Sequence, residues 1–355
     1  MPKFSLKKFS HSSLSLPIII LFLLILVNLF RGIGYFNIEL RNGVFYGNIP
    51  SVFYGAAELV IIAIGMSLVT ASSRGQDISV GVSAAISSSV FALVLREWLA
   101  AFPGSSVTWG VVLLALFASC FAGVLLGAFN GILVAVFKVQ PMVATLIIFT
   151  VGRSVAFLVN GKVSPILQYP IVKQIGTALP GIPIHTPILI VIFVCIIFAL
   201  VFKFTNLKLY VQSVGINEAA SRLNGINPVL MKMLSFMILG VCCSIAGFIA
   251  VCKIGRHDSV NILRLIEMDA ILAVAIGGNS LGGGKFSITG AVIGALTIEI
   301  LNQTLLRFQV DSEAIKLIKA LVIILLMILA SPIVREHLNR IFGGLSRKKT
   351  AKEEV

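Results

Sequence analysis

Charged residues are scarce in this chain, and their scarcity excludes an ordinary soluble protein. Asp, Glu, Lys and Arg together make up 12 % of the 355 residues, against about a quarter in soluble globular domains. Hydrophobic residues make up 58 %, and the mean hydropathy is +1.04. Apolar runs near the ~20 residues needed to cross a bilayer recur along the sequence, so we expect a multi-pass helical membrane protein.

Acidic residues are the scarcer of the two charge types, at 14 against 28 basic residues, and the formal net charge is +14. This excess does not indicate a nucleic-acid-binding protein, because the basic residues flank apolar runs and form no compact basic domain with interleaved aromatic side chains. With the N-terminus inside, more Lys and Arg residues fall on the cytoplasmic side than outside. We therefore expect both termini in the cytoplasm.

Cysteine and histidine are also few, and their positions argue against a metal centre or a catalytic site. The five cysteines lie in or beside apolar runs, at spacings that match no zinc site, and are expected to be buried thiols. They are Cys120, Cys195, Cys242, Cys243 and Cys252. The four histidines lie near span ends or in loops. No recurrent His, Ser and Asp constellation accompanies them, which weakens the hypothesis of an intramembrane enzyme.

The apolar runs predict an all-α, polytopic helical bundle with about ten transmembrane helices, one or two of them short or broken. They lie at about 14–30, 52–71, 78–95, 107–136, 141–159, 187–202, 231–251, 266–277, 287–306 and 314–331. No small-residue cleavage site follows the first run, so we interpret it as a retained span. The expected organisation is a cytoplasmic tail at 1–13, a transmembrane domain at 14–332 and a basic cytoplasmic tail at 333–355.

A polar stretch, SVGINEAASRLNGINP at Ser213–Pro228, interrupts this apolar chain. Asn217 is a good N-cap, and Glu218 puts a negative charge on the first helical turn, where the helix dipole favours it. Arg222 follows Glu218 at the favourable four-residue spacing, and Gly225 ends the helix. The stretch therefore predicts a helix of about two turns within a cytoplasmic loop at about 203–231.

Such a short helix is marginal alone, because isolated helices under ~12 residues are not stable in water. Ala219, Ala220 and Leu223 give it a small apolar face that could dock in a groove of a partner. The alternative from the residues alone is a plain surface helix between two spans.

Two polar, glycine-containing breaks divide the spans, at Ser72–Ala85 and Ala275–Ala295. GQDISVG in the first is similar in outline to GGKFSITG in the second, as in transporters built from repeated halves. Chance similarity in a sequence of low diversity is the alternative.

The second break contains GGNSLGGGK, which is not a phosphate-binding loop. The first position of that motif would be Asn279, and Phe286 stands where a magnesium-binding hydroxyl is required. We expect no ATP site in this chain. The glycines instead favour a backbone break between a half-span and the next helix.

Polar and acidic residues within spans are the remaining candidates for function. Glu267 and Asp269 lie two residues apart on a helix, so they face different sides and form no acid–base pair. They are either anchors at the membrane surface or part of a substrate entry. Glu58, Asp77 and Glu299 are not expected to face lipid, where a charge costs at least ~2.5 kcal/mol. A proton relay through them would make the chain an ion-coupled secondary transporter, which is the alternative function.

Three separated motifs carry a family resemblance that runs from about residue 63 to 332. They are N-G-x-L-V-x6-P-x-x-A-T-L from Asn130, G-x-N-E-x-A-x-R-L-x-G-I from Gly215 and E-x-D-A-I-x-A-V-x-I-G-G from Glu267. The chain resembles the permease subunits of bacterial ABC importers for monosaccharides, of the ribose and above all the galactofuranose type. Glu58 and Glu299 depart from the family pattern.

The resemblance implies alternating access between two permease chains, either two copies or a copy and a paralogue, surrounded by membrane lipid. It also implies a periplasmic sugar-binding protein and a cytoplasmic ATPase that uses ATP and Mg, whereas this chain holds no cofactor or metal. The residues expected to contact the ATPase are Asn217, Glu218, Ala219, Ala220, Arg222, Leu223 and Gly225. A neutral sugar favours a polar pathway, for which the candidates are Asp77, Ser83, Ser87, Asn130 and Asn302. Structural or gating roles are expected for Glu267, Asp269, Gly277, Gly278 and Gly284.

Overall fold

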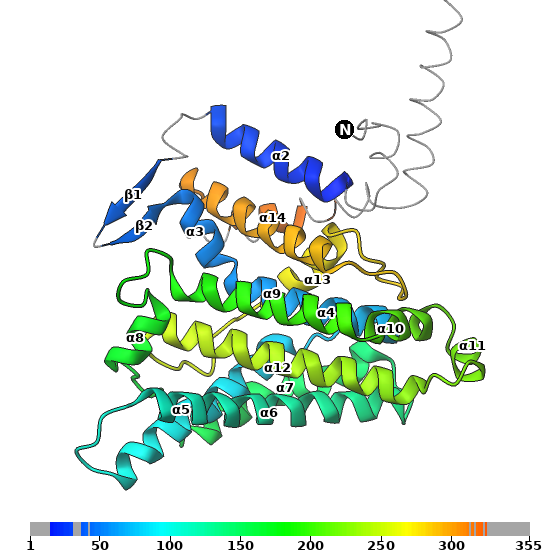
Figure 1. Cartoon of the computed structure of the whole chain (residues 1–355), viewed down its shortest axis with the longest axis horizontal. Helices are drawn as coiled ribbons and strands as arrows, with labels where there is room; N and C mark the ends of the chain where they lie inside the picture. Colours follow the sequence, from blue (N-terminus) through cyan, green and yellow to red (C-terminus); the bar gives the residue numbers. More distant parts are fainter. Residues whose placement is uncertain are drawn as a thin grey trace, which may run out of the picture.

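The computed structural model describes residues 15–30, 37–41, 43–311, 314–315, 317–321 and 324, and within these the chain is mostly helical (Figure 1). The first helices are α2 (Ser15–Phe30), α3 (Asn48–Gly55), α4 (Ala57–Ser73), α5 (Val80–Ala101), α6 (Trp109–Ala135), α7 (Pro141–Val159) and α8 (Pro170–Gly176). They are followed by α9 (Thr186–Phe204), α10 (Leu207–Ile216), α11 (Glu218–Leu223), α12 (Pro228–Ile254), α13 (Ile266–Ile276) and α14 (Ile288–Arg307). A small antiparallel hairpin, β1 (Ile38–Arg41) and β2 (Val44–Gly47), pairs Ile38 with Gly47.

Six of the described helices are long and apolar enough to cross a bilayer: α5, α6, α7, α9, α12 and α14. The pair α3 and α4, bent by 43°, makes a seventh when counted as one broken span. The predicted count of about ten is not confirmed. The run at 14–30 forms a helix of 16 residues, and the run at 266–277 forms one of only 11. Most of the run at 314–331 lies outside the described residues.

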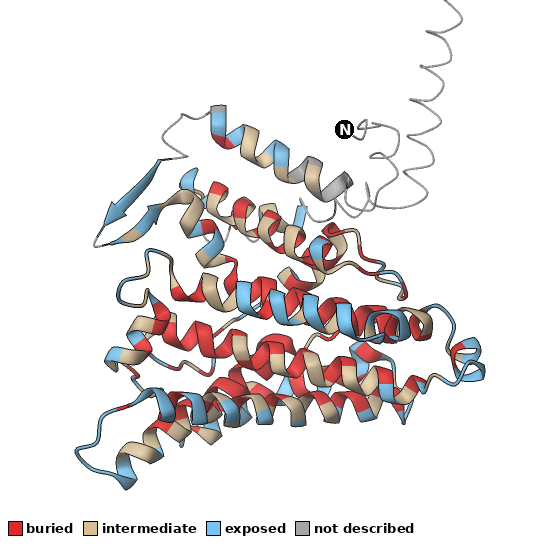
Figure 2. Cartoon of the chain, viewed as in Figure 1, coloured by how far each residue is buried: buried red, intermediate tan, exposed pale blue. Residues whose placement is uncertain are grey.

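Helices α4 and α12 form the centre of the bundle, because almost every residue of α4 is buried and α12 packs against α4, α5 and α6 (Figure 2). Gly123 and Gly127 of α6 lie against the backbone of α12 at Gly240 and Phe236, where an added Cβ would overlap carbonyl oxygens. Small residues at this spacing let two helices approach closely. The large apolar side chains that α6, α7 and α9 leave exposed suit contact with lipid.

At the edge of the bundle, α2 lies along α14, and Asn28 donates a hydrogen bond to Thr304 at 2.8 Å. In the middle, Arg153 of α7 donates to the carbonyl oxygens of Ser259 and Ile262, at 3.3 and 2.6 Å. These bonds hold the non-helical segment between α12 and α13 inside the bundle. Irregular backbone at this depth is tolerated only where protein groups satisfy it.

Both breaks predicted from the sequence are present as non-helical segments, one at residues 74–79 between α4 and α5 and one at 277–287 between α13 and α14. Gly277 lies so close to the carbonyl of Gly290 that no Cβ could fit, while Gly278 and Gly284 have φ of 74° and 82°. Glycine adopts these left-handed angles without steric cost. The glycines therefore let α13 end as a half-span and the chain turn into α14.

Candidate functional site

Helix α11 is a single short element at the end of the bundle opposite the β1–β2 hairpin (Figure 1). Asn217 caps it, since its side-chain oxygen accepts a hydrogen bond from the Ala220 backbone at 3.0 Å. Gly225 lies just beyond its end with φ of 79°. The helix has six residues, slightly fewer than predicted, and begins and ends where its cap and its glycine require.

The predicted intrahelical pair of Glu218 with Arg222 is not the ion pair that forms. Glu218 instead faces Lys232 of α12, with Oε2 and Nζ 2.6 Å apart. The hydrogen bond from Lys232 lowers the pKa of Glu218, and the charges of Lys232, Arg222 and Lys138 lower it further against partial desolvation. Arg222 thus acts on Glu218 only through its charge, and Lys232 fixes the position of the first turn.

The apolar face of α11 has no cover among the described residues. Ala219 and Ala220 are exposed, and Leu223 is 89 % exposed. A helix this short needs contacts outside itself to be stable. Its inner side has them, through Glu218 and the buried Ser221, whereas its outer apolar side is open to a partner.

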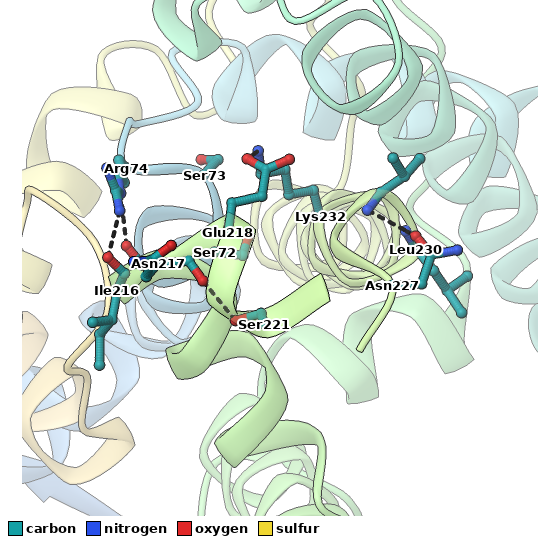
Figure 3. A network of polar contacts seen from close by, with 12 residues as sticks. Ser72, Ser73, Arg74, Ile216, Asn217, Glu218, Ser221, Asn227, Leu230 and Lys232 are labelled. Atoms are coloured by element: carbon teal, nitrogen blue, oxygen red, sulfur yellow. Dashed lines mark hydrogen bonds and ion pairs between the residues drawn. The ribbon is translucent and has the colours of Figure 1, made fainter. Parts of the chain in front are cut away.

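The root of α11 is tied to the two helix breaks (Figure 3). Arg74, at the end of α4, donates from Nε to the carbonyl of Gly215 at 2.7 Å and from Nη2 to that of Ile216 at 2.5 Å. Gly284 in the second break donates its N–H to the carbonyl of Ala71 at 2.9 Å. Thus the end of α10 and both breaks meet at one place, directly behind α11.

A polar cavity of about 280 Å³ lies within this junction. It is lined by Ser72, Ser73, Arg74, Val214, Asn217, Glu218, Ala219 and Lys232. Four of these residues come from the 203–231 loop singled out in the sequence, and three come from the first break. Nothing in the sequence pattern joins those two segments, because 141 residues separate Arg74 from Gly215.

Most of the predicted pathway residues gather in a second, buried polar cluster at the start of α5, which we name the Asp77 cluster. Asp77 accepts hydrogen bonds from the backbone N–H and hydroxyl of Ser79, at 2.7 and 2.6 Å. Asn130 of α6 donates to Ser79 at 3.0 Å and to Asp77 at 3.3 Å. The Ser83 hydroxyl lies 3.4 Å from that of Ser79. Ser79, which the sequence analysis did not select, is the residue that joins the others.

Two further pathway candidates stand apart from these contacts. Ser87 is buried one turn beyond Ser83 on α5, without a hydrogen-bond partner for its hydroxyl among the described residues. Asn302 lies on α14, where it donates to Glu299 at 3.4 Å. Asn302 is therefore not part of the Asp77 cluster.

Of the three acidic residues of the alternative, proton-relay hypothesis, Glu58 and Glu299 both lie near Lys253, and Asp77 lies apart from them. Glu58 pairs with Lys253 of α12 at 2.7 Å, and Glu299 accepts a hydrogen bond from Gln303 at 2.9 Å. Glu58 stands at the beginning of α4 and Asp77 lies beyond its end. A helix of 17 residues places them about 25 Å apart at ~1.5 Å per residue. The described residues therefore do not connect these carboxylates in one chain.

Glu267 and Asp269 have different neighbours. Asp269 forms an ion pair with Lys319 at 2.9 Å, whereas Glu267 is buried against Gly81 of α5. Glu267 is only 2 % exposed, so its side chain is packed inside the bundle. The two carboxylates do not form a shared site.

Among the described residues, no group of three or more His, Cys, Asp or Glu side chains could hold a metal ion. All five cysteines are free thiols. Three of them are buried, Cys242, Cys243 and Cys252, and the other two are half-buried.

Comparison with known proteins gives the family of this chain. Residues 48–331 match the family described as branched-chain amino acid transport system / permease component. The galactofuranose transporter permease of Escherichia coli strain K12 is 34 % identical over 94 % of this chain and 93 % of its own length. The fructose import permease of Bifidobacterium longum is 31 % identical over 87 % and 83 %, and the ribose import permease of E. coli K12 is 33 % identical over 78 % and 84 %. No solved structure matches. Because the family match and the first of these relatives both span most of its length, the chain belongs to this family of transport-system permeases, which are multi-pass proteins of the inner membrane.

Proposed function

We propose that this chain is the membrane-spanning subunit of an ABC importer that carries a monosaccharide across the bacterial inner membrane. Its relatives are named as import permeases for galactofuranose, fructose and ribose. They are transport subunits and not enzymes, which supports ATP hydrolysis, with its Mg, by a separate ATPase. The observation that carries the proposal is the uncovered apolar face of α11, whose root accepts hydrogen bonds from the first helix break and packs against the second.

The ATPase docks on α11 from the cytoplasm, through Asn217 to Gly225. Leu223 enters a groove of the partner, since an apolar helix face is suited to such a groove. Closing of the ATPase on nucleotide displaces α11, and the displacement opens the bundle alternately to either side. The excess of Lys and Arg on the side of α11 supports a cytoplasmic position for α11 and for both termini.

A second permease chain, either a copy or a paralogue, completes the pathway, and a periplasmic sugar-binding protein delivers the substrate. The Asp77 cluster supplies amide, hydroxyl and carboxylate groups that suit the hydroxyls of a neutral sugar. The second break turns at three glycines, Gly277, Gly278 and Gly284. Helix α13 is held against its neighbours by Glu267 and Asp269. Lipid covers the outer faces of α6, α7 and α9.

The test is uptake by proteoliposomes that hold the chain together with the ATPase and binding protein that co-purify with it, with labelled galactofuranose, ribose and fructose as substrates. The proposal predicts uptake that requires ATP and continues in the presence of a protonophore. Uptake by vesicles that contain this chain alone, and that stops when a protonophore is added, would instead establish an ion-coupled transporter.

A further inference from the structure

Arg74 occupies a backbone position that favours glycine. It is the C-cap of α4, with φ of 58° and ψ of 28°, in the left-handed region. Helices often end in this conformation, and the residue there is usually glycine, because a side chain raises the energy of the backbone. A long cationic side chain at such a position points to a role for the side chain itself.

The Arg74 side chain binds the end of the neighbouring helix. Its Nε and Nη2 donate to the carbonyl oxygens of Gly215 and Ile216, the last two residues of α10 (Figure 3). The last carbonyls of a helix have no partner within it and carry partial negative charge, so a guanidinium is well suited to them. The planar fork of an arginine reaches both carbonyls at once, which the single ammonium of a lysine does less well.

The second helix break also contacts Arg74. Gly283 has φ of 91°, and a Cβ added there would come within 2.6 Å of the Arg74 side chain. Its neighbour Gly284 donates to the carbonyl of Ala71, the last buried turn of α4. Gln212 of α10 adds a contact to the carbonyl of Phe286 at 3.3 Å. Arg74 therefore lies at the centre of three segments that are far apart in the sequence.

The first break then leads directly from Arg74 into the Asp77 cluster. Only Gly75 and Gln76 separate Arg74 from Asp77, and Asp77 binds Ser79 at the start of α5 and Asn130 of α6. This short segment joins α4 to α5. A shift of α10 that pulls on Arg74 therefore also pulls on the segment and on Asp77, which lies within it.

We infer that Arg74 is a positioning residue that makes the α10–α11 segment and the two helix breaks move as one unit, so that a displacement of α11 reaches the Asp77 cluster. Arg74 does not touch the substrate in this role. It transmits the movement that the ATPase imposes, and the inference therefore rests on the function proposed above.

The decisive variant is Arg74→Gly, which removes the side chain and at the same time relaxes the backbone, so folding is expected to be retained. The full-length chain, purified with its ATPase, is placed in proteoliposomes with the binding protein. Sugar uptake and ATP hydrolysis are then measured on the same vesicles. We expect ATPase association and ATP hydrolysis to persist, while uptake per ATP falls about tenfold, within the usual range of coupling between sites.

Two companion variants separate transmission from simple loss of stability. Arg74→Lys keeps the charge with one point donor and is expected to give an intermediate uptake per ATP. Arg96→Ala is the matched control, because Arg96 also donates to a backbone carbonyl, that of Asn160 at 2.9 Å, but at the far end of α5. It is expected to leave uptake per ATP unchanged.

Uptake per ATP within twofold of the wild type in Arg74→Gly would overturn the inference and leave the proposed function intact. If Arg74→Gly fails to assemble, the other two variants decide. Wild-type uptake per ATP in Arg74→Lys, together with lowered uptake per ATP in Arg96→Ala, would also overturn the inference. Absence of any ATPase from the wild-type complex would overturn both the inference and the proposed function.

Discussion

Glu218 is the residue on which the position of α11 depends most directly. It is the only acidic residue on that helix, and its carboxylate accepts a hydrogen bond from Lys232 of α12. Reversing its charge would set two cations against each other at the root of α11. Because Glu218 lies at the protein surface, the rest of the bundle should tolerate the change.

Glu218→Lys is therefore expected to abolish sugar uptake while the protein still inserts and folds. Uptake in proteoliposomes and elution from a sizing column measure the two effects separately. Glu39→Lys, at an exposed ion pair on β1, is the matched charge reversal and should leave uptake unchanged. Normal uptake by Glu218→Lys would count against a coupling role for α11.

The pH dependence of the Glu218 pair follows from its lowered pKa. A carboxyl whose pKa is depressed in the folded protein stabilises that state above its unfolded pKa, and this contribution is lost as the pH falls through the folded pKa. The ordinary value is 4.5. We expect the difference in the free energy of unfolding between wild type and Glu218→Gln to stay constant from about pH 8 to 5 and to disappear below the ordinary value. A difference that already disappears near neutral pH would show that another group is responsible for it.

At the scale of single elements, close packing of α6 on α12 depends on glycine. Gly127 lies against the backbone of Phe236 and Met237, which cannot move aside as a flexible side chain could. Gly127→Ala is expected to destabilise the bundle by about 1–3 kcal/mol, the usual penalty for overpacking. Gly110→Ala lies on the same helix, where an added Cβ would come no closer than 3.9 Å to Thr108 Oγ1, and it should have little effect in the same thermal unfolding assay. Equal stability of the two variants would contradict the close approach of these helices.

The sequence predicts the features of an element that depend on neighbouring residues, and it does not predict those that depend on residues far away along the chain. Asn217 and Gly225 define α11 by local rules of capping, and the predicted boundaries agree with the structure. The ion pairs between different elements could not be predicted in the same way. Lys232 is 14 residues from Glu218 of α11, and Lys253 is 195 residues from Glu58 of α4. Only the folded chain brings each pair together.

Hydropathy predicts where apolar segments lie but not how they are divided. The run at 266–277 forms a half-span because Gly277 and Gly278 end it, and the run at 52–71 belongs to a bent pair of helices. Both breaks were recognisable from their glycines and charged residues. Their direct contact, between Gly283 and Arg74, joins segments more than 200 residues apart, and no local pattern contains it.

At the scale of the whole molecule, the chain is a helical bundle that holds a polar junction behind one exposed short helix. The Asp77 cluster and the α11 junction occupy neighbouring parts of the same break, while Glu58 with Lys253 lies at the other end of α4. This arrangement suits a subunit that is moved from one end by a partner. Within the part of the chain that the structure describes, the carboxylates do not form a continuous line for a proton.

Photo-crosslinking from α11 in intact cells tests the central claim most directly. A photoreactive amino acid replaces Leu223, whose side chain is highly exposed, and a second variant carries it at Leu40, another exposed leucine, on β1. We predict that Leu223 captures an ATP-hydrolysing subunit in an ATP-dependent yield, and that Leu40 does not. Capture of lipid alone at Leu223, or of no nucleotide-hydrolysing protein at any ATP level, would contradict the account.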